Sequence, residues 1–113
     1  MTLRWLMMIS VLSLTAAAGA GCHEPTGPRT VANPDPAVKV PAIKHAVAER
    51  DLGAAAAMVT DLESDDAAVR LFAIQGLRRL TGEAFGYDYY ADPKHRAPAV
   101  ERWKQWLASQ QRR

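Results

Sequence analysis

Residues 62–70 of the chain read LESDDAAVR, and they separate two segments in which apolar residues recur at helical spacing. The segment before the stretch carries apolar side chains at Leu52, Ala55, Ala56, Val59 and Leu62. That i, i+3, i+4, i+7 pattern predicts a helix whose alanines allow a neighbouring helix to approach closely. The segment after it predicts a second helix from about Asp66 to Leu80, which Gly82 would end. Residues 62–70 therefore predict the turn of a helical hairpin.

The same stretch resembles the inter-helix turn and second helix of a HEAT repeat. In that family an acidic turn is followed by Val-Arg and then by Ala and Leu on the inner face. The matching residues here are Asp65, Asp66, Val69, Arg70, Ala73 and Leu77. The resemblance implies that the Asp and Arg side chains hydrogen-bond helix ends and that the apolar ones fill the seam. It covers one repeat, over about 52–80, and extends to a preceding helix expected over Pro41–Arg50.

A solenoid normally needs at least about three repeats to be stable. Because this chain is too short for three, another segment must cover the exposed apolar faces. The predicted C-terminal helix, from about Pro98 to Gln110, carries Trp103 and Trp106 on one face with Val100. Two tryptophans offer a large apolar area, so we expect this helix to pack on the repeat. The expected fold class is all-α, a short HEAT-like array of about four helices after a signal peptide and a disordered linker.

The N-terminus has the features of an export signal. Arg4 is followed by the apolar run Trp5–Leu14 and then by small residues up to Cys22, which predicts a signal peptide over residues 1–21. Cys22 is the only cysteine of the chain, so an intramolecular disulfide is excluded. The stretch Ala18-Gly19-Ala20-Gly21-Cys22 resembles the lipobox of bacterial lipoproteins. That resemblance implies that Cys22 is acylated and becomes the new N-terminus.

Gly19 departs from the lipobox pattern, which has an aliphatic residue at this position. Ordinary signal-peptide cleavage after Ala18 or Ala20 therefore stays open as an alternative. The four prolines after Cys22 predict an extended tether over residues 22–37, followed by one small folded domain over 38–110. We expect the protein in the cell envelope, held to a membrane through its N-terminal lipid, with the outer membrane or the periplasmic face preferred.

Charge does not favour a nucleic-acid partner. The chain has 14 basic and 12 acidic residues, and Arg4 in the leader is one of the basic ones. The charges of the exported part are therefore nearly balanced, whereas nucleic-acid-binding domains carry a basic surface.

The sequence contains none of the common catalytic or metal-binding motifs, namely G-x-S-x-G, a Walker-type loop, H-E-x-x-H or C-x-x-C. His45 and His95 lack a second ligand at helical spacing, and both are expected to face solvent. His23 and Glu24 lie in the predicted tether and are interpreted in the same way. We therefore predict no enzyme activity, no cofactor and no metal site.

The best candidate for a binding surface is an aromatic loop formed by Tyr87, Asp88, Tyr89 and Tyr90. Tyrosines supply contact area at a low cost in side-chain entropy, so the loop could recognise an as yet unidentified protein. In the opposite interpretation the rings lie on the helices and tie the loop down. The sequence thus predicts a non-catalytic protein-interaction or scaffold module. The alternatives are a periplasmic ligand-binding or enzyme accessory domain that uses the Tyr87–His95 loop, and a structural protein that pairs with its own second copy.

Overall fold

The computed structural model describes residues 30–113, and the predicted signal peptide, Cys22 and the first part of the predicted tether lie outside the described residues. In the described part of the chain all regular secondary structure is helical, which confirms the predicted all-α class. The elements are the α-helices α1, α2, α3 and α4 and one short 3-10 helix, η1. Their bounds are α1 Pro36–Ala48, η1 Leu52–Ala54, α2 Ala55–Asp61, α3 Ala67–Thr81 and α4 Pro93–Gln111.

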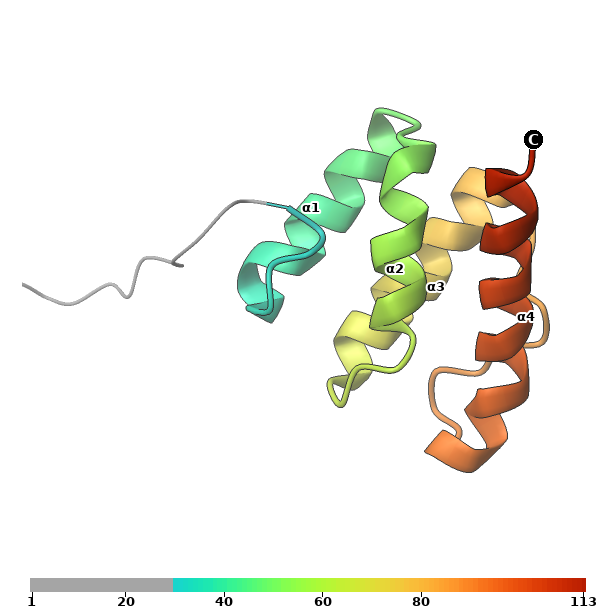
Figure 1. Cartoon of the computed structure of the whole chain (residues 1–113). Helices are drawn as coiled ribbons and strands as arrows, with labels where there is room; N and C mark the ends of the chain where they lie inside the picture. Colours follow the sequence, from blue (N-terminus) through green and yellow to red (C-terminus); the bar gives the residue numbers. More distant parts are fainter. Residues whose placement is uncertain (1–29) are drawn as a thin grey trace, which may run out of the picture.

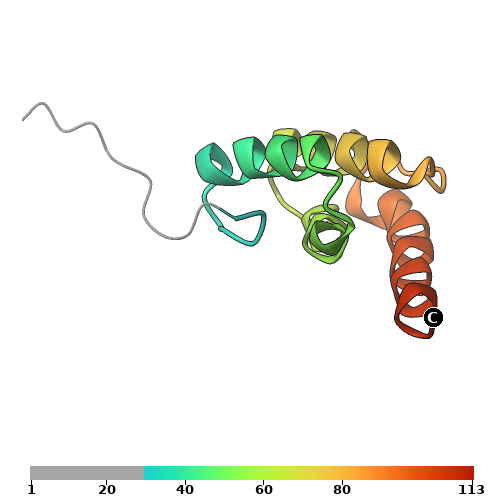
Figure 2. The ribbon, with the colours of Figure 1, turned by 90° about the horizontal axis from the view of Figure 1, so that it is seen from above.

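The helices form two layers. Figure 2 shows α1 and α3 side by side in one layer, with α2 and α4 in the other. Helices α1 and α2 both pack on α3, and α4 packs against α2. In Figure 1, α1 and α3 run in the same direction and α2 runs back between them. Among residues 30–113, none of the helices combines the length and the apolar character needed to cross a membrane.

Helix α3 has both of the predicted end signals. The Asp66 side chain accepts hydrogen bonds from the backbone N–H groups of Ala68 and Val69, at 2.8 and 3.1 Å, and so caps the first turn. At the other end Gly82 has a positive φ of 80° and its N–H donates to the Arg78 carbonyl oxygen. This left-handed conformation is one that glycine adopts without steric cost. Local sequence therefore places both ends of the helix.

Helix α1 begins at Pro36, earlier than the predicted start at Pro41. The earlier start has a local cause that the expected bounds did not include. The Asp35 side chain caps the helix by accepting a hydrogen bond from the Ala37 N–H, and Pro36 fits the first helical position. Pro41 consequently lies inside the helix. The helix ends at Ala48, before the predicted Arg50, which has a positive φ of 51°.

The predicted tether over 22–37 is too long at its C-terminal end. Val31 and Asn33 are only 7% and 4% exposed, and Val31 belongs to the hydrophobic core. The Val31 side chain thus packs in the hydrophobic core five residues before α1 begins at Pro36. The folded domain therefore includes residues that we expected to be linker.

Three helices meet at Gly76 in the middle of α3. A Cβ atom at this position would lie 3.0 Å from Met58 Sδ, 3.1 Å from Ile43 Cγ2 and 3.3 Å from Val47 Cγ2. Met58 and Ile43 are themselves 0% and 1% exposed. The absence of a side chain at Gly76 lets α1, α2 and α3 approach one another closely.

Helix α4 packs against α2 and buries Trp103, which is 0% exposed. Its ring meets the Phe85 ring edge to face, with centroids 4.7 Å apart. The helix begins at Pro93, before the predicted Pro98, because the Asp92 side chain accepts from the His95 N–H and caps it. The predicted helix thus exists and is longer at its N-terminus.

The direction of α4 departs from a regular repeat array. The chain after α3 returns to the turn between α2 and α3, where the Tyr87 hydroxyl donates to the Leu62 carbonyl oxygen at 2.5 Å. Helix α4 therefore starts near the end of α2 and runs antiparallel to it (Figure 1). In a regular array the equivalent helices of successive repeats run parallel, so α4 closes this end of the stack.

Candidate functional site

The repeat-motif residues act within the fold. Arg70 is 8% exposed, and its Nη1 donates to the carbonyl oxygens of Ser64 and Asp65 at 2.6 and 3.0 Å. Its Nε donates to the Tyr89 carbonyl oxygen at 3.1 Å. One guanidinium therefore joins the turn before α3 to the loop before α4. Asp66 caps α3, whereas Asp65 is exposed and contributes its carbonyl oxygen.

The apolar residues of the motif line the seam between the helices. Val69, Ala73 and Leu77 are 1%, 0% and 0% exposed. The implied packing role of these three side chains therefore agrees with their burial in α3. The motif supports the fold and leaves no free side chain for a ligand except that of Asp65.

The aromatic loop divides into a buried and an exposed part. Tyr87 is 9% exposed, its hydroxyl donates to the Leu62 carbonyl oxygen, and burial raises the pKa of that hydroxyl above the ordinary value. Tyr87 thus ties the loop to the helices and is not part of the exposed surface. Tyr90 is 78% exposed, its N–H donates to the Asp88 side chain at 2.9 Å, and its ring lies 4.3 Å from that of Tyr89.

Neither described histidine belongs to a metal cluster. The His95 Nδ1 lies 2.8 Å from Asp92 Oδ1, and both side chains are exposed. The hydrogen bonds from the His95 N–H and then from its ring lower the pKa of Asp92. Within residues 30–113, no three His, Cys, Asp or Glu side chains are grouped so as to hold a metal ion.

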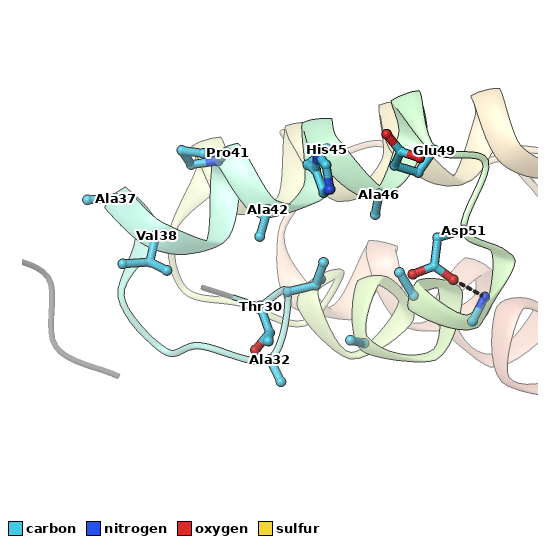
Figure 3. Close-up of a pocket in the computed structure, with 14 residues that line it drawn as sticks. Thr30, Ala32, Ala37, Val38, Pro41, Ala42, His45, Ala46, Glu49 and Asp51 are labelled. Carbon is cyan, nitrogen blue, oxygen red and sulfur yellow. Dashed lines mark hydrogen bonds between the residues drawn. The ribbon is translucent and has the colours of Figure 1, made fainter. Parts of the chain in front are cut away.

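A groove of about 800 Å³ lies beside α1 and was not anticipated from the sequence. Figure 3 shows α1 as one wall and the segment around Thr30 and Ala32 as the other, with the start of α2 as the floor. The lining residues are mostly small and apolar. They are Thr30, Val31, Ala32, Ala37, Val38, Pro41, Ala42, His45, Ala46, Glu49, Asp51, Gly53, Ala54 and Ala57.

The two acidic side chains of the groove lie at one end. Glu49 and Asp51 lie where α1 ends, and Figure 3 shows them beyond Ala46. The C-terminal end of a helix carries a partial negative charge from its unpaired carbonyl groups. Asp51 uses its Oδ1 to cap η1 by accepting from the Gly53 N–H at 2.9 Å. The acidic groups of the groove are therefore confined to this end, while the rest is lined mainly by alanine, valine and proline together with His45 and Thr30.

Outside the groove, a largely buried ion pair links α1 to the end of α2. Lys39 Nζ lies 2.6 Å from Asp61 Oδ1, and Asp61 Oδ2 has no hydrogen-bond partner among the described residues. Burial raises the pKa of Asp61 above its ordinary value, although the hydrogen bond and the charge of Lys39 act in the opposite direction. Lys39 and Asp61 were not expected to pair, because they are 22 residues apart and no local pattern in the sequence indicates a contact between them.

Comparison of the chain with known protein families, with curated proteins and with solved structures finds no match. The candidate site is therefore defined by its own geometry, which consists of the groove beside α1 and the exposed tyrosine surface at the other end of the fold.

Proposed function

We propose that this chain is a membrane-anchored, non-catalytic protein-interaction module of the bacterial cell envelope, folded as a short HEAT-like array. The observation that carries the proposal is the open groove of about 800 Å³ beside α1, lined mainly by alanine, valine and proline. An apolar concave surface of this size is typical of a binding site. The polar side chains of its walls are those of Thr30, His45, Glu49 and Asp51.

The position of the groove fits a tethered protein. Thr30 lines the groove and lies eight residues after Cys22, the proposed lipid attachment site. Eight residues span at most about 28 Å when fully extended. A lipid on Cys22 would thus hold the groove within reach of the membrane surface, and the tether would raise the effective concentration of the module near envelope partners.

The anchor is tested by intact-mass measurement on the full chain expressed in a bacterial host, with Cys22→Ala as the control. We expect a mature N-terminus at Cys22 carrying acyl mass, and recovery in the membrane fraction that the Cys22→Ala variant loses. Cleavage after Ala18 or Ala20 without added mass would overturn the anchored form of the proposal. The interaction role would then belong to a freely diffusing exported domain.

A second candidate is a periplasmic ligand-binding or enzyme accessory domain that uses the Tyr87–His95 loop. The observation that favours it is the 78% exposure of Tyr90, whose ring lies against that of Tyr89, and the same loop leads to the exposed His95–Asp92 pair at the start of α4. Loss of a measurable ligand or activity in Tyr90→Ala or His95→Ala, with unchanged helical circular dichroism, would favour this candidate. Retention of function in both variants would favour the groove.

A further inference from the structure

We propose that the groove beside α1 binds an amphipathic helix of another envelope protein, with the apolar face of that helix on the alanines and a Lys or Arg beside Glu49. This inference rests on the proposed function as an interaction module, and it names the class of partner. Four features of the described residues support it: a vacant position in the helix layers, the small side chains, the charge at one end and the composition of the remaining surface.

The groove occupies a vacant position in the two-layer arrangement. Helix α2 and helix α4 form one layer over α1 and α3 (Figure 2). On the other side of α2, where the array would place the first helix of a preceding repeat, the described part of the chain, residues 30–113, supplies only the short segment that precedes α1 (Figure 2). Val31 fills part of this position and is 7% exposed. The groove is the part of this position that Val31 leaves open. It lies beside α1, where a bound helix could run along α1.

The length and depth of the groove suit a helix. Its lining residues on α1 extend from Ala37 to the Glu49 cap, a length of about 18 Å at the helical rise of 1.5 Å per residue. That length matches about three helical turns of a partner. The side chains that face it are methyl groups at Ala42, Ala46, Ala54 and Ala57. Small side chains permit the interaxial distances of about 8 to 10 Å at which helices pack.

The charge of the groove specifies a cationic end on the partner. Glu49 is exposed and takes part in no ion pair within residues 30–113. The lining contains no Lys or Arg, and Asp51 and the end of α1 add negative charge next to Glu49. A basic side chain at this end of a bound helix would therefore meet complementary charge, which directs its orientation.

Residues 30–113 offer little with which a second copy could fill the groove. In the described part of the chain the exposed large apolar residues are Leu52 and Tyr90, which lie apart on η1 and in the loop before α4. The residues of α4 that face solvent are mostly polar, among them Glu101, Arg102 and Lys104. An apolar stripe at helical spacing is thus missing from the described surface. Because the surface of residues 30–113 supplies no such stripe, the proposed occupant is a helix from a different protein.

The test is site-specific photocrosslinking of the full chain in its native host. The photoreactive amino acid p-benzoylphenylalanine replaces His45, which is exposed and lines the groove, or Ala48, which is exposed on α1 and does not line it. We expect a crosslink from position 45 and not from position 48. Mass spectrometry of the crosslinked peptide should identify a segment with apolar residues at helical spacing and a Lys or Arg at one end.

A charge reversal sharpens the test. Glu49→Lys should lower the crosslink yield from position 45 by about threefold or more, the effect of losing one exposed ion pair. Glu101→Lys, an exposed reversal on α4, should leave the yield unchanged. An unchanged yield in Glu49→Lys would overturn the proposed role of charge. A crosslink to a lipid, to a second copy or to a segment without helical apolar spacing would overturn the proposed partner.

A third probe at Tyr90 separates this inference from the proposed function. A protein crosslink from position 90, with none from position 45, would overturn helix binding in the groove and leave the interaction module standing. The absence of any protein crosslink from positions 45 and 90, with native circular dichroism in both variants, would overturn the inference and the proposed function together. A crosslink from position 45 to the expected class of segment supports both.

Discussion

Lys39 on α1 and Asp61 at the end of α2 form a largely buried ion pair, with Nζ 2.6 Å from Oδ1 and side chains 13% and 5% exposed. Burial of two charges costs solvation free energy, which their attraction only partly returns. The raised pKa of Asp61 agrees with this balance, because its largest cause is burial. The pair is therefore expected to tolerate joint replacement better than the loss of one member.

Replacing Lys39 by methionine leaves the Asp61 carboxylate buried without its partner. We expect Lys39→Met to lower the free energy of unfolding by about 3 kcal/mol. The double variant Lys39→Met with Asp61→Leu should lie within about 1 kcal/mol of the native protein or above it. Urea unfolding followed by circular dichroism measures both. A Lys39→Met protein as stable as the native one would show that the pair contributes nothing to the packing of α1 on α2.

The raised pKa of Asp61 gives a pH dependence of known sign. Between its ordinary value of 3.8 and its raised value, the folded protein holds the Asp61 proton more often than the unfolded chain does. Falling pH therefore favours the folded state through this group, and rising pH removes that contribution as it passes the folded-state pKa. We expect the native protein to gain stability relative to Asp61→Asn as the pH falls through this window.

The comparison of native protein with Asp61→Asn is made by urea unfolding at several values between about pH 3 and pH 7. Taking the difference removes the opposite contribution of Asp92, whose lowered pKa makes it lose stabilisation in acid. A difference that stays constant across the range, or that falls on acidification, would contradict the assigned direction.

The two acidic residues of the α2–α3 turn should behave differently. The Asp66 side chain caps α3 through the N–H groups of Ala68 and Val69, while the exposed Asp65 side chain caps no helix. We expect Asp66→Ala to cost about 1 kcal/mol of stability, the usual value of an N-cap. Asp65→Ala should cost less than about 0.5 kcal/mol, as for a surface position. Equal losses in thermal unfolding would contradict this assignment.

A methyl group at Gly76 would crowd the junction of three helices. Alanine favours a helix by about 1 kcal/mol over glycine, but overpacking a buried site costs about 1 to 3 kcal/mol. Because Met58, Ile43 and Val47 would all lie within 3.3 Å of the new Cβ, we expect Gly76→Ala to be destabilising on balance. Gln75→Ala, at the exposed neighbouring position, is the matched control and should be near neutral. Denaturant unfolding measures the stability of both variants. A Gly76→Ala protein as stable as the native one would show that the helices move apart to accommodate the methyl group without cost.

Two tyrosines of one loop form a second matched pair. Tyr87→Phe removes the hydroxyl that donates to the Leu62 carbonyl oxygen, and we expect a loss of about 1 to 2 kcal/mol. Tyr90 is 78% exposed, so Tyr90→Phe should leave stability unchanged. Thermal unfolding should therefore separate the two variants. Similar midpoints would mean that the loop is not held by Tyr87.

Much of the local structure could be predicted because its signals lie within a few residues of one another. The helical spacing and the Asp66 cap placed α3, and the two tryptophans identified α4 as a covering helix. The errors at helix starts came from the overlooked caps Asp35 and Asp92, each followed directly by a proline. These signals were present in the sequence and could have been used.

The candidate site could not be predicted in the same way. The groove combines residues from the segment around Thr30, from α1 and from the start of α2. Its volume depends on the distances between these segments in the folded protein. The tyrosine loop was recognised, but periodicity does not tell which ring is buried. Tyr87 packs in the hydrophobic core and donates to the Leu62 carbonyl oxygen, whereas Tyr90 is exposed.

By itself, the amino-acid sequence determined that this protein is helical and approximately where its helices lie, since spacing and capping act over three or four residues. Only the tertiary structure decided the direction of α4, the Lys39–Asp61 pair and the open groove. Each depends on contacts between distant residues, separated by 22 positions for Lys39 and Asp61 and by 25 for Leu62 and Tyr87. Such contacts form only when whole helices pack, because no local pattern of side chains specifies which distant partner each of them will meet.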